Sequence, residues 1–410
     1  MKRKGSLLAA ATVALSACGG GAGNAPAPIP AITVSPSTSA YDATIDKTYT
    51  DNWGVELAVY KNGQPDYVNG YGLRDRGLPD SFYGPGIWDI PQPDAVLNLP
   101  RGKFSPDAGT IFEIGSISKE FTAGAILLLQ QDGKLSVNDS VAKYFPGLPG
   151  ASQMTLVNLL QHSSGYVDYN NFFAYPDFSA AYNAFMQSGQ TDYQPIVDRL
   201  ATFPLQFAPG SQYSYSNSNY LLLGIIVARV SGEPLGDFLE QRIFAPLAMT
   251  DTHQGYPPQG TVDFALGYFD NNGTEQRTYQ WNLTWLAGPG GITSTVTDLE
   301  KWDRAVRSPG LFTPTSLAQM FAPGPYPQSY GTYAFGWFIA TLDGHPYIWH
   351  DGAIGGFVSM NATFPKDGID IIVLVNNASA EDPYDIIPSL LQTALTAQSR
   401  QSFDKLRMTS

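Results

Sequence analysis

The folded part of the chain begins with two strand-like runs that a polar turn separates. Residues 55–60 (VELAVY) and a second run ending at residue 72 flank Asn62-Gly63. Asn-Gly between two such runs is a strong signal for a β-hairpin, because both residues tolerate the left-handed backbone conformation of a tight turn. The pattern therefore predicts a hairpin at the start of the fold.

Two longer runs are apolar around the whole circumference of a helix. Residues 121–129 (FTAGAILLL) are followed by Asp132-Gly133, and residues 221–230 (LLLGIIVARV) are followed by Gly232. A helix that is apolar on every side is buried, and glycine commonly follows its last turn. Both runs are predicted to be core helices, and further helical runs lie between residues 155 and 250.

Near the C-terminus, three runs alternate as strands do. They are residues 347–350, 357–364 and 369–375, and residues 365–368 (PKDG) predict a turn between the last two. Strands at both ends with helices between them predict an α/β fold of the α+β kind. We expect one antiparallel sheet built from both termini, flanked by helices, with an inserted, mainly helical subdomain. Residues 74–108, rich in Pro, Gly and Asp, are predicted to be a long surface loop.

The first forty residues differ in character from the body. Residues 1–17 combine a basic start, an apolar run and small residues, which is the layout of a secretory signal peptide. The segment 15–19 (LSACG) resembles the lipobox of bacterial lipoproteins, which implies lipidation of Cys18, the sole cysteine. Residues 18–40 are mostly Gly, Ala, Pro and Ser and predict a flexible tether. The protein is therefore expected to be exported and lipid-anchored in the bacterial cell envelope, facing the periplasm or in the outer membrane.

Composition and charge narrow the partners of the folded domain, which is expected over residues 41–397, before a disordered tail at 398–410. The formal net charge is −13, and this argues against nucleic acid, because no basic stripe is present to neutralise phosphates. The four histidines of the chain and a body without thiols match no common metal-ligand spacing. No cofactor motif stands out. The expected partners are a small-molecule substrate and the lipid of the anchor, and the oligomeric state stays open.

The candidate chemistry starts from serine three residues before lysine, a spacing that occurs three times. Ser402 lies in the predicted tail, and Ser140 lies in a polar stretch beside a lysine expected to be solvated. Ser116 directly precedes the first core helix, so that Ser116 and Lys119 share one helical face. Burial would lower the pKa of Lys119 and allow the neutral amine to take the serine proton. By itself, this stretch supports a capping serine with an incidental lysine equally well.

Two further patterns offer partners for such a nucleophile. Tyr-x-Asn occurs four times, but only Tyr215-Ser216-Asn217 lies between a Pro-Gly turn and a buried helix, which is a rigid setting for a site. His-x-Gly occurs at residues 253–255 and 350–352. Only the second is predicted to lie on a strand, where backbone amides can face a substrate. Each pattern is weak when taken alone.

Together and in this order, the three patterns resemble the motifs of the serine beta-lactamase and penicillin-binding-protein superfamily. The similarity is greatest to the class C beta-lactamase-like branch, which includes D-Ala-D-Ala carboxypeptidases, D-aminopeptidases and esterases. Segments 159–165 (LLQHSSG), 244–249 (FAPLAM) and 290–295 (GGITST) agree, and the resemblance covers about residues 50–395. It implies a beta-lactamase-like fold and a serine hydrolase. His162, in the first segment, is expected to be a hydrogen-bonded structural histidine.

The resemblance also implies roles for individual residues. Ser116 would be the acylated nucleophile, and Lys119 and Tyr215 would share general-base and general-acid duty. Which of the two takes the first proton stays open, because a coupled pair titrates as a unit. Asn217 would orient the carbonyl side of the substrate. The backbone amides of Ser116 and Ala353 would form the oxyanion hole.

The third motif departs from the family pattern. His350 and Asp351 stand where beta-lactamases typically have a lysine and a hydroxyl residue that hold a substrate carboxylate. Imidazole is mostly neutral near pH 7, and an aspartate would repel an anion. His350 and Gly352 are therefore expected to bind neutral substrates, and carboxylesters are the expected class. The alternatives are D-amino-acid peptides, weak beta-lactamase activity or, in another class, a non-catalytic wall-binding or sensor protein.

Overall fold

The computed structural model describes residues 40–49, 53–78, 104–174, 193–258, 261–271, 273–278 and 283–396. The predicted signal peptide, Cys18, most of the predicted tether and the predicted tail lie outside these residues. So does the middle of the long loop predicted at 74–108. Ala40, predicted as the last residue of the tether, is instead the first residue of helix α1 (Ala40–Thr48).

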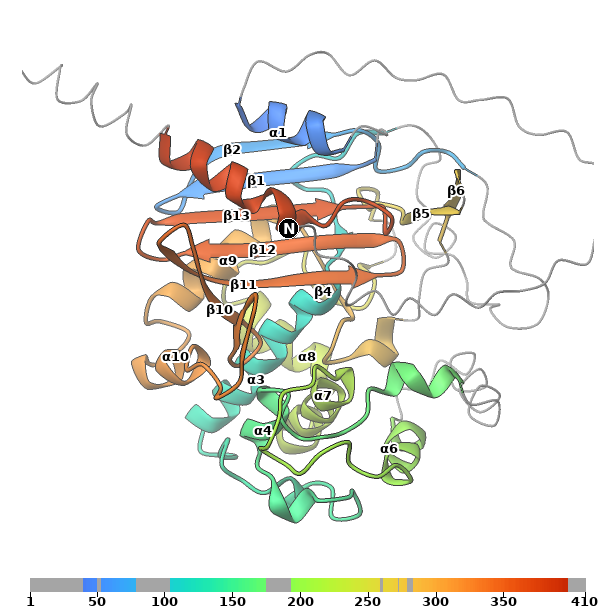
Figure 1. The fold of residues 1–410 in the computed structure, drawn as a ribbon, viewed down its shortest axis with the longest axis vertical. Helices are drawn as coiled ribbons and strands as arrows, with labels where there is room; N and C mark the ends of the chain where they lie inside the picture. The colour runs from blue at the N-terminus through green and yellow to red at the C-terminus, as the bar shows by residue number, and fades with distance from the viewer. Residues whose placement is uncertain are drawn as a thin grey trace, which may run out of the picture. The chain divides into compact units, whose positions relative to one another are not determined.

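An antiparallel sheet of eight strands forms the centre of the fold (Figure 1). Its order is β2-β1-β13-β12-β11-β10-β9-β8, so the first two strands of the body pair with the last ones, and Val55 lies opposite Val375. The sheet built from both termini is thus confirmed. Its strands are β1 (Val55–Lys61), β2 (Gln64–Tyr71), β8 (Pro327–Gln328), β9 (Gly331–Tyr333), β10 (Phe338–Leu342), β11 (His345–Ile354), β12 (Phe357–Phe364) and β13 (Ile369–Val375).

The hairpin predicted at the start of the body is β1 and β2. Asn62 and Gly63 turn the chain with φ values of 52° and 71°, the left-handed conformations that a type I′ turn requires. All seven residues of β1 are buried, because both faces of this part of the sheet are covered. Helix α9 (Val296–Arg307) packs against β1 and β13 on one face, and the helix at 387–396 crosses the other face (Figure 1).

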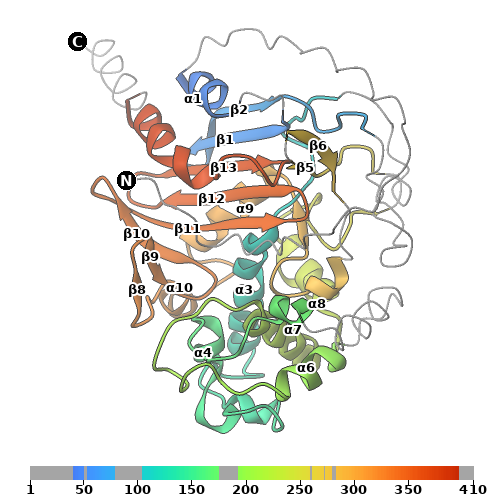
Figure 2. The same cartoon turned by 45° about the vertical axis from the view of Figure 1, so that its right-hand side comes forward.

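The helical part lies at one side of the sheet, and α3 (Ser118–Gln131) runs between the two (Figure 2). Both predicted core helices are confirmed as α3 and α7 (Asn217–Ser231), and the glycine after each has a positive φ, 70° at Gly133 and 87° at Gly232. The other α-helices are α4 (Leu156–Leu160), α6 (Gln194–Ala201), α8 (Leu235–Leu239) and α10 (Pro314–Met320). None of the helices in the described part of the chain has both the length and the apolar character of a membrane span.

Short elements complete the framework around the site. A small sheet has the order β3-β7-β4, with β3 (Phe112–Glu113), β7 (Ile292–Ser294) and β4 (His253–Gln254), and β5 (Tyr268–Asn271) pairs with β6 (Thr274–Arg277). The short helical turns are η1 (Gly115–Ile117), η2 (Val141–Lys143), η3 (Ala151–Gln153), η4 (Tyr169–Ala174), η5 (Glu240–Phe244), η6 (Leu283–Leu286) and η7 (Pro383–Ile386).

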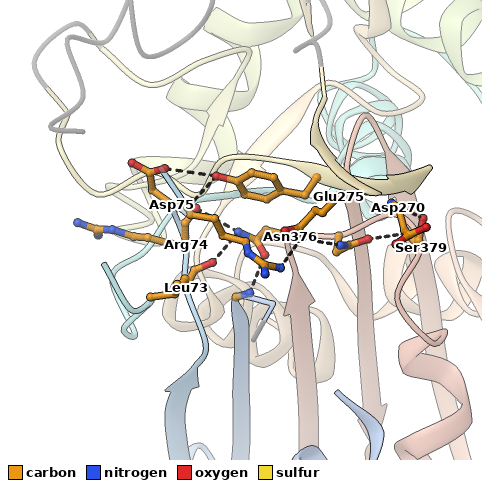
Figure 3. A network of polar contacts seen from close by, with 11 residues as sticks. Leu73, Arg74, Asp75, Asp270, Glu275, Asn376 and Ser379 are labelled. Atoms are coloured by element: carbon orange, nitrogen blue, oxygen red, sulfur yellow. Dashed lines mark hydrogen bonds and ion pairs between the residues drawn. The ribbon is translucent and has the colours of Figure 1, made fainter. Parts of the chain in front are cut away.

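A polar network ties the chain after β2 to the β5–β6 hairpin and to the segment after β13 (Figure 3). The Asn376 side chain donates hydrogen bonds to the carbonyl oxygens of Leu73 and Arg74, each at 3.1 Å. An ion pair between Arg76 and Glu275 joins the same segment to β6. These contacts hold the start of the predicted long loop against the sheet.

Candidate active site

Ser116 lies in the turn η1, directly before α3. Gly115 enters this turn with a φ of 51°, and a Cβ atom on Gly115 would lie only 2.9 Å from the backbone nitrogen of Ala353 on β11. A Cβ atom on Gly352 would lie 2.1 Å from the Ile114 carbonyl oxygen. Only glycine permits backbones to approach so closely. The two glycines therefore bring the Ser116 turn and the Ala353 amide together, as an oxyanion hole requires.

Lys119 extends from the first turn of α3 toward Ser116 and is completely buried. Its Nζ lies 2.9 Å from Ser116 Oγ, 2.8 Å from Asn217 Oδ1 and 2.7 Å from the Pro289 carbonyl oxygen. Burial lowers the pKa of Lys119 to about 7, against the opposing charges of Asp168 and Asp351. The amine is thus poised to change its protonation state near neutral pH.

The three contacts of Lys119 suit both of its protonation states. An ammonium has three N–H donors and finds three oxygen atoms. A neutral amine has two N–H donors, which the Asn217 and Pro289 oxygens can accept, and its lone pair then faces the Ser116 hydroxyl. The same geometry therefore serves before and after a proton moves from Ser116 to Lys119, and no rearrangement is needed.

Tyr215 reaches the same serine from the segment before α7. Its hydroxyl is hydrogen-bonded to Ser116, and burial raises its pKa well above the ordinary value of a tyrosine. Lys119 Nζ lies over the ring, 4.8 Å from its centre. Because the phenol keeps its proton where Lys119 loses its own, the two groups differ in role: the lysine suits a base and the tyrosine suits an acid.

Asn217, the first residue of α7, is held by a residue that sequence reasoning missed. Asp168 Oδ2 accepts hydrogen bonds from the backbone nitrogen of Asn217 at 3.0 Å and from its Nδ2 at 2.9 Å. This fixes which end of the amide points to Lys119 and leaves one Nδ2 hydrogen for a substrate. No spacing in the sequence marks Asp168, because its role exists only once the loop before η4 packs against α7.

His350 does not lie where the sequence predicted. The side chain is completely buried, its Nε2 lies 3.0 Å from the Tyr333 hydroxyl, and its Nδ1 lies 2.6 Å from the Asp351 carbonyl oxygen. Burial lowers the pKa of His350 to about 3, so the imidazole is neutral, as predicted. Because both nitrogens are occupied, we correct its role: His350 supports the strand from within and does not bind substrate directly.

Asp351, next along β11, points the other way. Its side chain is 47% exposed, and neighbouring side chains of a strand face opposite sides. Partial burial of the Asp351 carboxylate, followed by the charge of Asp382, raises its pKa to about 6. Asp351 is therefore largely an anion at pH 7, as expected from the sequence.

The other Ser-x-x-Lys and His-x-Gly motifs do not belong to the group formed by Ser116, Lys119 and Tyr215. Ser140 caps η2 by accepting a hydrogen bond from the Ala142 nitrogen, and Lys143 is 53% exposed and paired with Asp139, as predicted. Ser402 lies outside the described residues. The prediction that only the second His-x-Gly lies on a strand was wrong, because residues 253 and 254 form β4. That strand pairs with β7 in the small sheet, whereas the second motif lies on β11, next to the turn that carries Ser116.

His162 is a structural residue, as predicted. Its ring is completely buried, with its centre 4.3 Å from that of Tyr215, and its Nδ1 accepts a hydrogen bond from the Ser216 nitrogen at 3.2 Å. It thereby fixes the segment that carries Tyr215. Within the described residues, no group of three or more His, Cys, Asp or Glu side chains is arranged to hold a metal ion.

Comparisons with known proteins find similar sequences. The model of the beta-lactamase family matches residues 43–394. A D-aminopeptidase of Cereibacter sphaeroides is 28% identical over 78% of this chain and 61% of its own length. Penicillin-binding protein 4* of Bacillus subtilis is 29% identical over 67% of this chain and 62% of its own length. The chain thus spans about three fifths of the length of these relatives.

Solved structures show the same fold. The D-amino acid amidase of Ochrobactrum anthropi, in complex with L-phenylalanine amide, superposes with a TM-score of 0.70 over 88% of this chain and 98% of its own, at 24% identity. A penicillin-binding protein homologue from Pyrococcus abyssi, which is octameric, also gives 0.70, over 87% and 76%, at 23% identity. These likenesses confirm the predicted beta-lactamase-like fold.

Proposed function

The chain belongs to the beta-lactamase family of serine hydrolases, and on that basis we propose that it cleaves acyl bonds through an acyl-enzyme at Ser116. The contact that carries this proposal is the 2.9 Å between Lys119 Nζ and Ser116 Oγ. The amine is buried and has a pKa of about 7. A base of this kind, within hydrogen-bond distance of a hydroxyl, activates it as a nucleophile.

We assign a residue to each step of the proposed reaction. Ser116 Oγ attacks the acyl carbon and its proton moves to Lys119, while the amides of Ser116 and Ala353 stabilise the oxyanion. Tyr215 donates its proton to the leaving atom, and the Lys119 ammonium restores the phenol. Water then hydrolyses the ester by the same route in reverse. This assignment makes Lys119 the first base and Tyr215 the acid.

For the substrate, we propose amides of D-amino acids, including peptides whose departing amine carries no carboxylate. The support is the likeness to proteins named as a D-aminopeptidase and a D-amino acid amidase. Carboxylesters, the class expected from the sequence, are the second candidate. The half-exposed Asp351 favours both over penicillins, because it stands where the family typically has a hydroxyl residue that helps hold a carboxylate.

A substrate panel tests this choice. It contains D- and L-amino acid amides, short-chain nitrophenyl esters and nitrocefin. We expect hydrolysis of D-amides in preference to their L-isomers, and slow or no hydrolysis of nitrocefin. Fast nitrocefin hydrolysis would contradict the proposed role of Asp351. Acylation without release, seen as a stable mass increase of the intact protein, would instead support a sensor or wall-binding protein.

The pH dependence of the reaction follows from Lys119. Because the base works as a neutral amine, its active fraction grows as pH rises through the pKa of about 7. We expect kcat/KM to increase roughly tenfold per pH unit below that point and to level off above it. Initial rates between about pH 5 and about pH 9, with a substrate that does not titrate there, measure this. A rate that stays constant across this range would rule out Lys119 as the base.

We also propose that the enzyme is exported and lipid-anchored in the cell envelope through Cys18. Residues 15–19 support this by their resemblance to a lipobox. Cys18→Ser should release the protein from the membrane fraction and abolish labelling with radioactive palmitate, while the released protein stays active. A Cys18→Ser protein that still sediments with membranes would refute the anchor.

A further inference from the structure

Asp351 places a carboxylate beside the reacting groups, and the mechanism above does not use it. It lies two residues before Ala353 on β11, which is about 7 Å at the rise of a strand. Its side chain is 47% exposed, whereas that of His350 is 1% exposed. A ligand at the oxyanion hole can therefore reach the Asp351 carboxylate, but it cannot reach the His350 imidazole.

The charge of Asp351 acts on groups that the proposed reaction uses. Its charge acts on Tyr215, on Tyr213 and on Lys119. In the proposed reaction, the leaving atom must lie beside the Tyr215 hydroxyl to receive its proton. The Asp351 carboxylate is therefore near enough to Tyr215 for its charge to act on a leaving group beside that hydroxyl.

The negative charge of Asp351 is poorly compensated. Its oxygen lies 3.5 Å from His350 Nδ1, but that nitrogen bonds to the Asp351 carbonyl oxygen and the imidazole is neutral. Lys119 is buried and directed to Ser116. The strand partner of Asp351 is the buried, apolar Met360. Asp382, the N-cap of η7, adds a second negative charge that acts on Asp351.

We infer that Asp351 makes the leaving-group side of the site selective for cations. The preferred substrates would be amides or esters whose departing amine or alcohol carries an ammonium or guanidinium group, and a carboxylate there would be rejected. A substrate cation would supply a counter-charge that no described residue brings into contact with the Asp351 carboxylate. This inference rests on the proposed acyl-enzyme at Ser116 and goes further by naming the charge of the leaving group.

Leaving groups of similar shape and different charge test the inference on the full-length enzyme. Esters of the acyl group that the panel shows to be turned over fastest are made with choline, with its neutral isostere 3,3-dimethylbutanol and with 3-hydroxypropanoate. The variants are Asp351→Asn, which keeps the shape of the side chain, and Asp351→Thr, which restores a hydroxyl. Asp343→Asn is the matched control, because Asp343 is an exposed turn residue with a φ of 50° that asparagine tolerates.

The readout is the ratio of kcat/KM values between esters, compared between variants, so that intrinsic differences in ester reactivity cancel. We expect the choline-to-neutral ratio to fall about tenfold in Asp351→Asn, and the carboxylate-to-neutral ratio to rise about tenfold in Asp351→Thr. High salt should weaken the choline preference of the wild-type enzyme. Asp343→Asn should leave both ratios as they are.

The possible failures are distinguishable. Unchanged ratios in both Asp351 variants, in an enzyme whose turnover still requires Ser116, would overturn the selectivity and leave the proposed function standing. Turnover that persists in Ser116→Ala would overturn the proposed function and, with it, this inference. A shift of equal size in Asp343→Asn would show that the overall charge of the protein determines the preference between esters. This too would overturn the role of Asp351.

Discussion

Replacing Ser116 by alanine is expected to lower kcat/KM at least about 1,000-fold for every amide and ester that the enzyme hydrolyses. The substitution removes the atom that forms the acyl bond, and Lys119 and Tyr215 are left without a nucleophile. Steady-state kinetics measure the loss. The unfolding temperature should change little, because the Ser116 hydroxyl contacts two side chains that keep other interactions.

Ser140→Ala is the matched control, because Ser140 has the same Ser-x-x-Lys spacing at a half-buried position whose lysine is exposed. Its hydroxyl caps η2, so the variant loses about 1 kcal/mol of stability and keeps wild-type kinetics at temperatures where it is folded. Equal residual activity in Ser116→Ala and Ser140→Ala would contradict the assignment of Ser116 as the nucleophile.

Lys119→Met is expected to lower kcat/KM about 1,000-fold while the protein remains folded. Methionine fills a similar volume without a base. Two oxygens, Asn217 Oδ1 and the Pro289 carbonyl, lose their donor, which costs about 1–3 kcal/mol. Removal of a buried amine offsets part of that cost, because burial disfavours its charge.

The pH profile separates this catalytic role from a structural one. The residual activity of Lys119→Met should lose its rise through pH 7, whereas damage to the fold would scale the whole profile and keep its shape. Lys143→Met, in the exposed motif, is the control and should keep the wild-type profile. A Lys119→Met enzyme that retains more than about a tenth of wild-type kcat/KM would place the base elsewhere.

Much of this arrangement could be predicted because local patterns and tertiary packing agree. Asn62-Gly63 predicts its turn since few other pairs accept two positive φ values. The run at 121–129 predicts a buried helix, and that burial is what lowers the pKa of Lys119. Ser116 could therefore be separated from Ser140 before any distance was known.

The features that were missed depend on contacts between distant segments. The support that Asp168 gives to Asn217 comes from a loop 49 residues away, and nothing in either segment marks the pair. His350 was placed at the substrate because it stands where the family typically has a substrate-binding lysine, but the alternation of β11 turns it toward Tyr333. Strands β8 to β10 are short and partly exposed. Polar and apolar residues do not alternate along them clearly enough to predict strands.

The central claim is that catalysis proceeds through a covalent bond to Ser116 Oγ. Its most direct test is to react the protein with a fluorophosphonate probe and to locate the added mass by peptide mass spectrometry. We predict one adduct, on the peptide that contains Ser116, formed in proportion to the loss of activity. An adduct on another residue, or complete inactivation without any adduct at Ser116, would contradict the account.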